Sequence, residues 1–264
     1  MKHDLSEHVR SAGYEALFLL GGFLAGNARL SQRNLERASQ WLDESPSRRQ
    51  QFKRLVKRGL IAVDPSEGFS ASLTELGRAA FAGGRDPEGA WSREWDGQWR
   101  LITFDLPRSQ NRLRMRMRRW LDANHFGRLQ GSVWIGPDPV PDVESVLAED
   151  RHAAVDFVVF EGNPAHASDP REVAASVWNF GEIEEKYRAY EEFAQDTIDT
   201  LQKKAPAYSH LKAILDDDRR HWWDAVRRDP LLPKVLHDKT YRGPKAWKTR
   251  GKLLARLDKA ADAS

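Results

Sequence analysis

The 264-residue sequence contains no cysteine, only three methionines and no apolar run close to the about 20 residues that a membrane span needs. Without cysteine the chain can form neither a disulfide scaffold nor a cysteine-based zinc site. Its longest apolar stretch, residues 14–26, is too short to cross a bilayer and has the spacing of a core helix. The first ten residues carry two acids and do not resemble a secretory signal. We therefore expect a cytoplasmic protein with no membrane segment.

The small net charge of +3 conceals a strong asymmetry along the chain. Residues 27–60 carry nine basic and three acidic side chains, and residues 201–264 carry sixteen and eight. Residues 131–200 between them carry four basic and sixteen acidic side chains. The basic parts favour a polyanionic partner, although solvated basic helices would give the same counts.

A basic helix is predicted from about residue 46. Ser45 suits the N-cap position and Pro46 the first helical position, while Gly59 suits the end of the helix. Phe52 and Leu55 share one side of this helix, and basic or amide side chains occupy the other. Six basic residues and no acid lie between residues 48 and 58.

The surroundings of the basic helix indicate a winged helix-turn-helix. Two helices, at about 11–25 and from Ser31 to about 42, precede it, and two short strands around a Pro-Ser-Glu-Gly turn follow, before a helix capped by Thr74. In this arrangement the third helix enters the DNA major groove and the hairpin lies on the backbone. The expected DNA-binding residues are Ser47, Arg48, Arg49, Gln50, Lys53, Arg54 and Lys57.

A Gly/Pro-rich linker at 82–90 leads to a region of alternating strands and helices. The predicted order is a strand at 97–106, a helix at 109–124, two strands joined near Gln130 and Gly131, a helix over "PDVESVLAED", and a last strand over "HAAVDFVVFEG". This βαββαβ order is the ferredoxin-like arrangement. Five arginines between 112 and 119 are either a solvated face or a second contact to phosphates; the sequence leaves both open.

The chain from residue 166 on has mainly helical spacing. Asp169 and Pro170 begin this region, the helices break at Pro230 and Pro233, and a basic helix follows Gly243. The fold class is therefore α+β. We expect a winged helix domain at 1–84, a ferredoxin-like dimerisation domain at 91–165 and a helical C-terminal domain at 166–264.

Several separate segments resemble the PaaX family, the transcriptional repressors of phenylacetic acid degradation and their relatives. They are "RRQQFKRLVKRGLI", "LTELGRAAF", "WDGQWRLITFDLP", "FGRLQGSVWIGP", "VWNFGEIEEKYRAYEEF" and "RRDPLLP". The resemblance implies a homodimeric repressor that binds a double-stranded operator with an inverted repeat and is released by a small effector, such as an aryl- or acyl-CoA thioester. The family's central domain is similar to the small CRISPR adaptation nucleases. Where relatives often have a glycine, this chain has Asn124 followed by His125, and we expect Asn124 to supply a left-handed residue.

Asp105 is the first candidate for catalytic chemistry, because it ends the first strand of the predicted ferredoxin-like domain. The related nucleases use a carboxylate at this place to bind a divalent metal, so a metal-dependent nuclease is the alternative function. A hydrolytic metal site needs more than one carboxylate, and although Asp122 and Asp138 lie at helix ends in this domain, no compact acidic cluster converges on the first strand. We therefore expect Asp105 either to cap the turn that follows or to survive as a relic of the nuclease fold, and we expect neither an enzyme nor a bound cofactor.

The effector is expected between the central and C-terminal parts, where the sequence is rich in tryptophan. Aromatic side chains with a few basic residues suit an apolar acyl group on a phosphate-bearing carrier, although each single tryptophan more often belongs to a core. His221 near Asp218 resembles an acid–base pair but is more typical of a surface or packing residue. The expected effector-binding residues are Trp134, Trp178, Trp223, Arg242 and Lys245.

Overall fold

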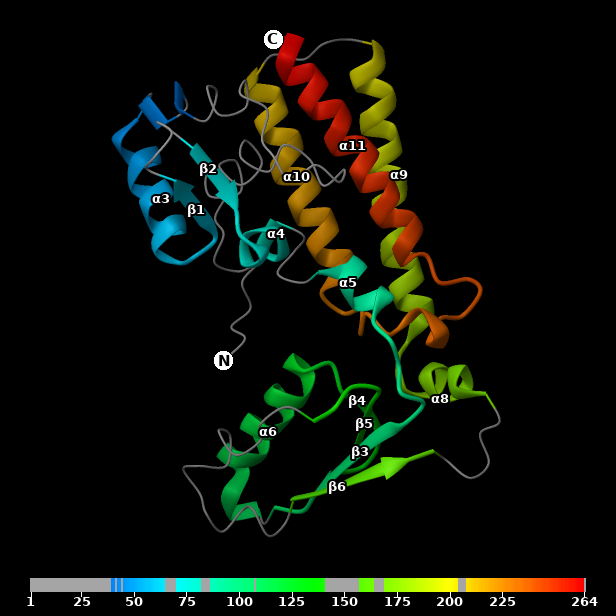
Figure 1. The fold of residues 1–264 in the computed structure, drawn as a ribbon. Helices are drawn as coiled ribbons and strands as arrows, with labels where there is room; N and C mark the ends of the chain where they lie inside the picture. The colour runs from blue at the N-terminus through cyan, green and yellow to red at the C-terminus, as the bar shows by residue number, and fades with distance from the viewer. Residues whose placement is uncertain are drawn as a thin grey trace. The chain divides into compact units, whose positions relative to one another are not determined.

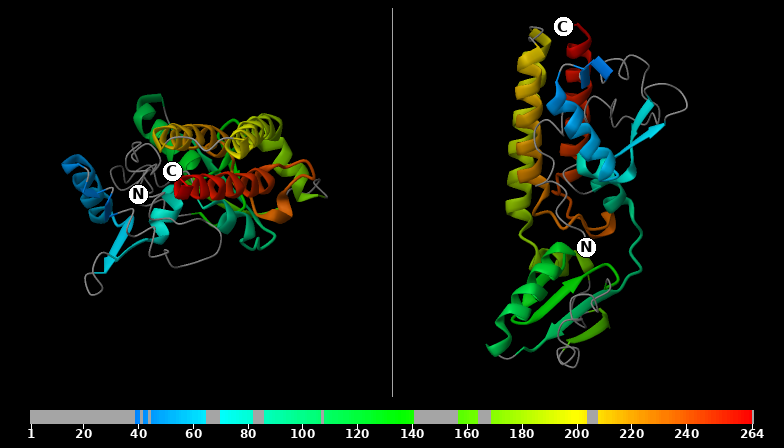
Figure 2. Two further views of the ribbon diagram at one scale, coloured as in Figure 1. Left: turned by 90° about the horizontal axis from the view of Figure 1, so that it is seen from above. Right: turned by 90° about the vertical axis from the view of Figure 1, so that its left-hand side faces the viewer.

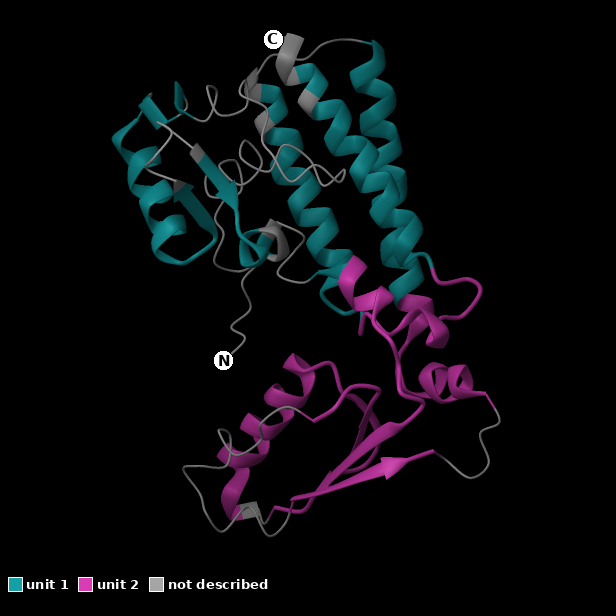
Figure 3. Ribbon diagram, viewed as in Figure 1, with its two compact units in different colours: residues 1–87, 183–229, 242–264 teal, residues 88–182, 230–241 magenta. Residues whose placement is uncertain are grey.

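The computed structural model describes residues 39–40, 42–43, 45–64, 70–81, 86–106, 108–140, 157–163, 169–203 and 208–263. The chain divides into two compact units (Figure 3). Unit 1 contains residues 1–87, 183–229 and 242–264, and unit 2 contains residues 88–182 and 230–241. The protein contains helices and antiparallel sheets, as the predicted α+β class requires.

The N-terminal part of unit 1 consists of α3 (Pro46–Lys57), the hairpin strands β1 (Ile61–Asp64) and β2 (Ser70–Leu73), and α4 (Glu75–Phe81) (Figure 1). The hairpin is antiparallel, with Ile61 opposite Leu73 and Val63 opposite Ala71. The predicted helix at 11–25, most of the one ending near 42, and the Pro-Ser-Glu-Gly turn lie outside the described residues.

Unit 2 is built on a four-stranded antiparallel sheet. After α5 (Pro87–Ser92) come β3 (Trp99–Phe104), the 3-10 turn η2 (Arg108–Gln110), α6 (Asn111–Ala123), β4 (Gly127–Gln130), β5 (Val133–Gly136) and β6 (Phe157–Gly162). The strand order in the sheet is β4-β5-β3-β6. These strands and α6 lie where the sequence predicts them, whereas the helix predicted at 141–150 lies outside the described residues.

An apolar core lies on each face of this sheet. Ile102 and Phe104 of β3 face Leu113, Met117 and Leu121 of α6. On the opposite face, the core contains Trp99, Ile135, Val173, Ala174, Leu232 and Leu236. These last four residues come from α8 (Pro170–Val177) and from the segment 230–241, which contains the 3-10 turn η4 (Lys234–Leu236). Parts of the predicted C-terminal region therefore complete the core of unit 2.

At two glycines the sheet backbone lies very close to side chains of the elements packed on it. A Cβ on Gly136 would lie 2.7 Å from the Phe126 ring, and a Cβ on Gly127 would lie 2.0 Å from Cγ1 of Val177. Any side chain at Gly127 would push α8 away from β4, so glycine at this position allows the helix to pack closely on the sheet.

Three long helices follow: α9 (Phe180–Lys203), α10 (Tyr208–Val226) and α11 (Gly243–Ala263), which lie side by side (Figures 1 and 2). The helical spacing from residue 170 does not reveal that α8 ends before Trp178, whose backbone is extended. Asn179 then accepts a hydrogen bond from the Glu182 N–H at 3.2 Å and begins the next helix. In the part of the chain that the structure describes, no helix has both the length and the apolar character required to cross a membrane.

The left-handed residue after α6 is His125, with φ of 64°, and the prediction of Asn124 is wrong. Asn124 has φ of −99°, and its side-chain amide donates to the Trp120 carbonyl at 2.8 Å. His125 and Phe126 donate their N–H groups to Asp122 and Leu121 at 3.0 Å each. This pattern needs the positive φ one residue later than expected, because Asn124 still completes the last turn of the helix.

Candidate nucleic-acid interface

Local interactions fix both ends of α3. The Ser45 hydroxyl accepts a hydrogen bond from the Ser47 N–H at 3.3 Å, and Pro46 occupies the first helical position, as predicted. At the other end, Gly59 has φ of 72°, and this left-handed residue ends α3 before β1 begins. No acid lies in the first turn of α3, and Arg54 and Lys57 lie in the last turn, where they favourably meet the negative end of the helix dipole.

The side chains of α3 divide into a buried face and an exposed basic face. Phe52 and Leu55 are buried, and Arg48 is half-buried on their side. The remaining six predicted DNA-binding residues are all exposed: Ser47, Arg49, Gln50, Lys53, Arg54 and Lys57. The spacing of Gln50, Lys53, Arg54 and Lys57 places these four on the side opposite Phe52.

Arg49 differs from the other basic residues of this face. Its guanidinium forms an ion pair with Asp43 at 2.8 Å and donates a hydrogen bond to the Leu42 carbonyl at 3.2 Å. An exposed ion pair of this kind is weak and leaves the remaining N–H groups available. Arg49 is thus held at the N-terminal edge of the face, where the helix begins.

The hairpin and α4 hold α3 in place. Leu60 is buried, and its N–H donates to the Leu55 carbonyl while its carbonyl accepts from Thr74 N–H. The Thr74 hydroxyl donates to the Gly59 carbonyl at 2.6 Å and accepts from the Gly77 N–H at 3.0 Å, so Thr74 caps α4 as predicted. Gly77 lies so close to Leu60 that an added Cβ would stand 2.0 Å from its carbonyl oxygen. The outer face of α3 is therefore presented by a helix with a defined orientation against the hairpin.

Asp105 lies just after β3 and is exposed. Among the described residues it has no hydrogen-bonding partner, and the predicted cap of the following turn is not seen there. Asp138, one of the two acids that could have accompanied it, is held by Arg93. No group of three histidine, aspartate or glutamate side chains that could hold a metal ion occurs within the described ranges.

The five predicted effector-binding residues belong to different units. Trp134 is buried in the core between the sheet and α6, and Trp178 stacks on Trp99 with ring centroids 6.2 Å apart, both in unit 2. Trp223, Arg242 and Lys245 belong to unit 1, where Trp223 is half-buried.

Glu191 holds both of the basic residues predicted to meet effector phosphates. Arg242 forms two hydrogen bonds with the Glu191 carboxylate, at 2.7 and 3.0 Å, and Lys245 lies at 2.8 Å from it. Burial opposes ionisation of Glu191, but these two cations hold its pKa below its ordinary value. The sequence did not indicate this partner, because Glu191 lies about fifty residues away from both cations, on another helix.

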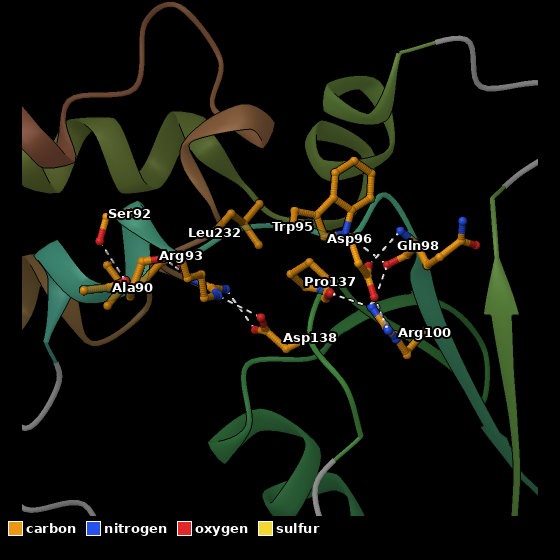
Figure 4. Close-up of polar contacts among 12 residues, drawn as sticks. Ala90, Ser92, Arg93, Trp95, Asp96, Gln98, Arg100, Pro137, Asp138 and Leu232 are labelled. Carbon is orange, nitrogen blue, oxygen red and sulfur yellow. Dashed lines mark hydrogen bonds and ion pairs between the residues drawn. The ribbon is translucent and has the colours of Figure 1, made fainter.

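Two arginines of unit 2 form a polar clamp that the sequence did not indicate (Figure 4). Arg93 pairs with both oxygens of Asp138, at 2.7 and 2.8 Å, and donates to the Leu231 carbonyl at 2.5 Å. Arg100 is buried, and it contacts the Asp96 carboxylate, which lowers the pKa of Asp96, and the Pro137 carbonyl at 3.1 Å. The clamp joins the start of β3, the end of β5 and the segment 230–241.

The helices of unit 1 contain a buried ion pair. Asp218 and Arg250 are 0% and 1% exposed and lie 3.0 Å apart, and the Tyr190 hydroxyl donates to Asp218 at 2.6 Å. Asp218 therefore does not serve His221, whose Nδ1 lies 2.8 Å from the Asp217 carbonyl and whose ring stacks on Phe193. His221 is a packing residue at the surface of α10.

Comparison with known proteins identifies unit 2. Residues 92–174 match the family model described as the PaaX protein central Cas2-like domain. The chain thus carries a PaaX central domain, which confirms the resemblance stated from the sequence and indicates a transcriptional regulator that binds DNA.

A solved structure shares the fold over nearly the whole chain. It is described as uncharacterized protein Rv0674 from Mycobacterium tuberculosis, is 18% identical, and is aligned over 96% of this chain and 97% of that chain with a TM-score of 0.54. At this identity the match shows the fold alone. No curated protein matches the sequence.

Proposed function

We propose that the protein is a homodimeric repressor whose recognition helix is α3, within a winged helix-turn-helix. The observation that carries this proposal is the exposed face of α3, on which basic and amide side chains lie opposite the buried Phe52 and Leu55. A helix with such a face suits the major groove, where arginine and glutamine can pair with base edges and lysine with phosphates. The ferredoxin-like βαββαβ arrangement of the central domain supplies the dimer, and each α3 reads one half of an inverted repeat.

Individual residues have different roles in this proposal. Ser47, Gln50 and Arg54 face base edges, whereas Lys53 and Lys57 meet phosphates or the rim of the groove. Arg49 and Arg48 contact phosphates near the N-terminal end of α3, where the N–H groups of the first helical turn also favour an anion. In this role Asp105 has no catalytic step, and the protein acts in the cytoplasm.

The test requires an operator selected with the full-length protein from a random library of duplexes. Binding of this operator and of an unrelated duplex is then titrated over a range of salt concentrations. Arg54→Ala should cost about 1–3 kcal/mol on the operator and relax its sequence preference. Lys57→Ala should weaken binding to both duplexes equally. It should also reduce the salt slope, the fall of log K with log salt concentration, by about 0.9.

A matched control is Lys203→Ala, which removes an exposed positive charge from the end of α9. It should bind both duplexes like the wild type. If Arg54→Ala and Lys57→Ala also bind like the wild type, α3 is not the recognition helix.

We further propose that a small effector, such as an aryl- or acyl-CoA thioester, releases the operator. Arg242 and Lys245 can bind its phosphates only in competition with Glu191, which holds both of them. Glu191→Gln should therefore strengthen the thermal shift and the operator release caused by the thioester. An unchanged response in Glu191→Gln would remove both cations from the effector site, and release by free acids alone would remove the phosphate-binding role.

A further inference from the structure

Helix α6 concentrates positive charge on the outside of unit 2. Five of the eight residues from 112 to 119 are arginines, and the other three are Leu113, Met115 and Met117. Leu113 and Met117 are buried against the sheet, whereas Met115 is 40% exposed. Successive residues of an α-helix are rotated by about 100° around its axis. This rotation places four of the arginines on the same side of α6 as Met115, away from the core: Arg112, Arg116, Arg118 and Arg119.

The contacts of these arginines show which of them are available. Arg114 lies beside the core and donates to the Leu106 carbonyl, so it stabilises the chain locally. Arg116 and Arg118 are half-buried. Arg112 and Arg119 are exposed, and neither makes a hydrogen bond or ion pair with another described residue. These two guanidinium groups lie about two helical turns apart on one stripe.

This charge pattern opposes helix formation. Arginines three and four positions apart, such as 112 with 116 and 116 with 119, repel one another. The first turn of α6 contains no acid, and its N-cap residue Gln110 makes no capping hydrogen bond with its side chain, so positive charge lies near the positive end of the helix dipole. The packing of Leu113, Met117 and Leu121 on the sheet therefore has to offset the repulsion among the arginines. An anion bound to the outer face would reduce this repulsion.

We propose that the outer face of α6 binds the phosphate backbone of DNA as a second, sequence-independent contact. This inference rests on the proposed DNA-binding function and extends it to unit 2. The chemistry favours the DNA backbone because arginine's planar fork matches phosphate oxygens. Residues 112–119 contain no Asn, Gln, Ser or Thr to accompany arginine in reading base edges, whereas α3 has Ser47 and Gln50. Such a contact adds affinity and salt dependence without adding sequence preference.

The test compares the wild type with the double variant R112Q/R119Q in salt titrations on the selected operator and on a random-sequence duplex. Losing two phosphate contacts should reduce the salt slope by about 1.8 and weaken binding about 60-fold at 0.1 M salt, equally on both duplexes. The charge-conserving variant R112K/R119K should keep the salt slope of the wild type. The control R188Q/R220Q removes the same net charge from two exposed arginines that already face acidic neighbours, and it should bind both duplexes normally.

The outcomes separate this inference from the proposed function. If the wild type binds DNA without sequence preference, or does not bind DNA at all, the proposed function is wrong. If the wild type and the α3 variants behave as expected but R112Q/R119Q keeps its salt slope and affinity, α6 does not contact DNA and only the inference fails. If R112Q/R119Q lowers the melting temperature and R112K/R119K fails to restore binding, the arginines pair with acids of the chain itself, which also overturns it.

Discussion

Removing the carboxylate of Asp218 should be among the most damaging single changes in unit 1. Asp218 accepts hydrogen bonds from Nε and Nη2 of Arg250, at 3.2 and 3.0 Å, and from the Tyr190 hydroxyl at 2.6 Å. The Arg250 guanidinium also lies 5.0 Å from the ring centroid of Trp222 and 5.8 Å from that of Trp247. In Asp218→Ala these rings remain, but the buried cation loses its counter-ion, which costs about 3–5 kcal/mol.

The expected loss of stability arises from the buried, uncompensated charge of Arg250 and not from the loss of a net stabilising attraction between Asp218 and Arg250. The double variant D218L/R250M removes both charges and fills a similar volume, so it should recover most of the lost stability. Because the chain has two compact units, unfolding is not expected to be two-state, and the local readout is hydrogen–deuterium exchange of amides in α10 and α11. Asp218→Ala should accelerate their exchange by at least about 100-fold, since 1.4 kcal/mol corresponds to a factor of ten.

Two results would refute this reasoning. One is a cost below about 1 kcal/mol for Asp218→Ala, which would mean that water or another side chain compensates Arg250. The other is a double variant no more stable than the single one, which would mean that the pair itself supplies the stability.

Three further changes test the described geometry. His125→Gly should stabilise unit 2 by about 1 kcal/mol by relieving a left-handed backbone, whereas the neighbouring Asn124→Gly should destabilise it; hydrogen–deuterium exchange of amides in α6 and β4, measured for both variants, distinguishes the positions. Glu191→Gln should destabilise unit 1 near neutral pH but not in acid: the folded pKa of Glu191 lies below 4.5, so its stabilisation is present above about pH 4.5 and lost as pH falls through the folded value. Melting temperatures that differ equally at all pH values would contradict this assignment. Gly127→Ala should cost about 1–3 kcal/mol because its Cβ would overlap α8, and a neutral effect in thermal melts would show that α8 moves freely.

Local sequence patterns predicted most of the individual elements. The caps at Ser45 and Thr74 are present because each depends on residues two or three positions away. The apolar stripe of α6 and the hairpin of β4 and β5 follow from periodicity and from Gly131, with φ of 51°. The exposed face of α3 also follows from periodicity, which is why the candidate interface could be named from the sequence.

Features that depend on distant residues could not be predicted in this way. The segment 230–241 completes the core of unit 2, although it connects two helices of unit 1. The partners of Arg93, Arg242 and Arg250 are 45, 51 and 32 residues away, and no local pattern relates them. The break between α8 and α9 is hidden because apolar residues keep their helical spacing across Trp178.

Sequence preference is the most direct test of whether α3 reads DNA. A library of random duplexes is selected with the full-length wild type and, in parallel, with Arg54→Ala, at one fixed salt concentration. We expect an inverted repeat for the wild type and a weaker preference at one symmetric pair of base positions for the variant, with the rest of the motif retained. Selection of the same motif with the same preference by both proteins would contradict this expectation.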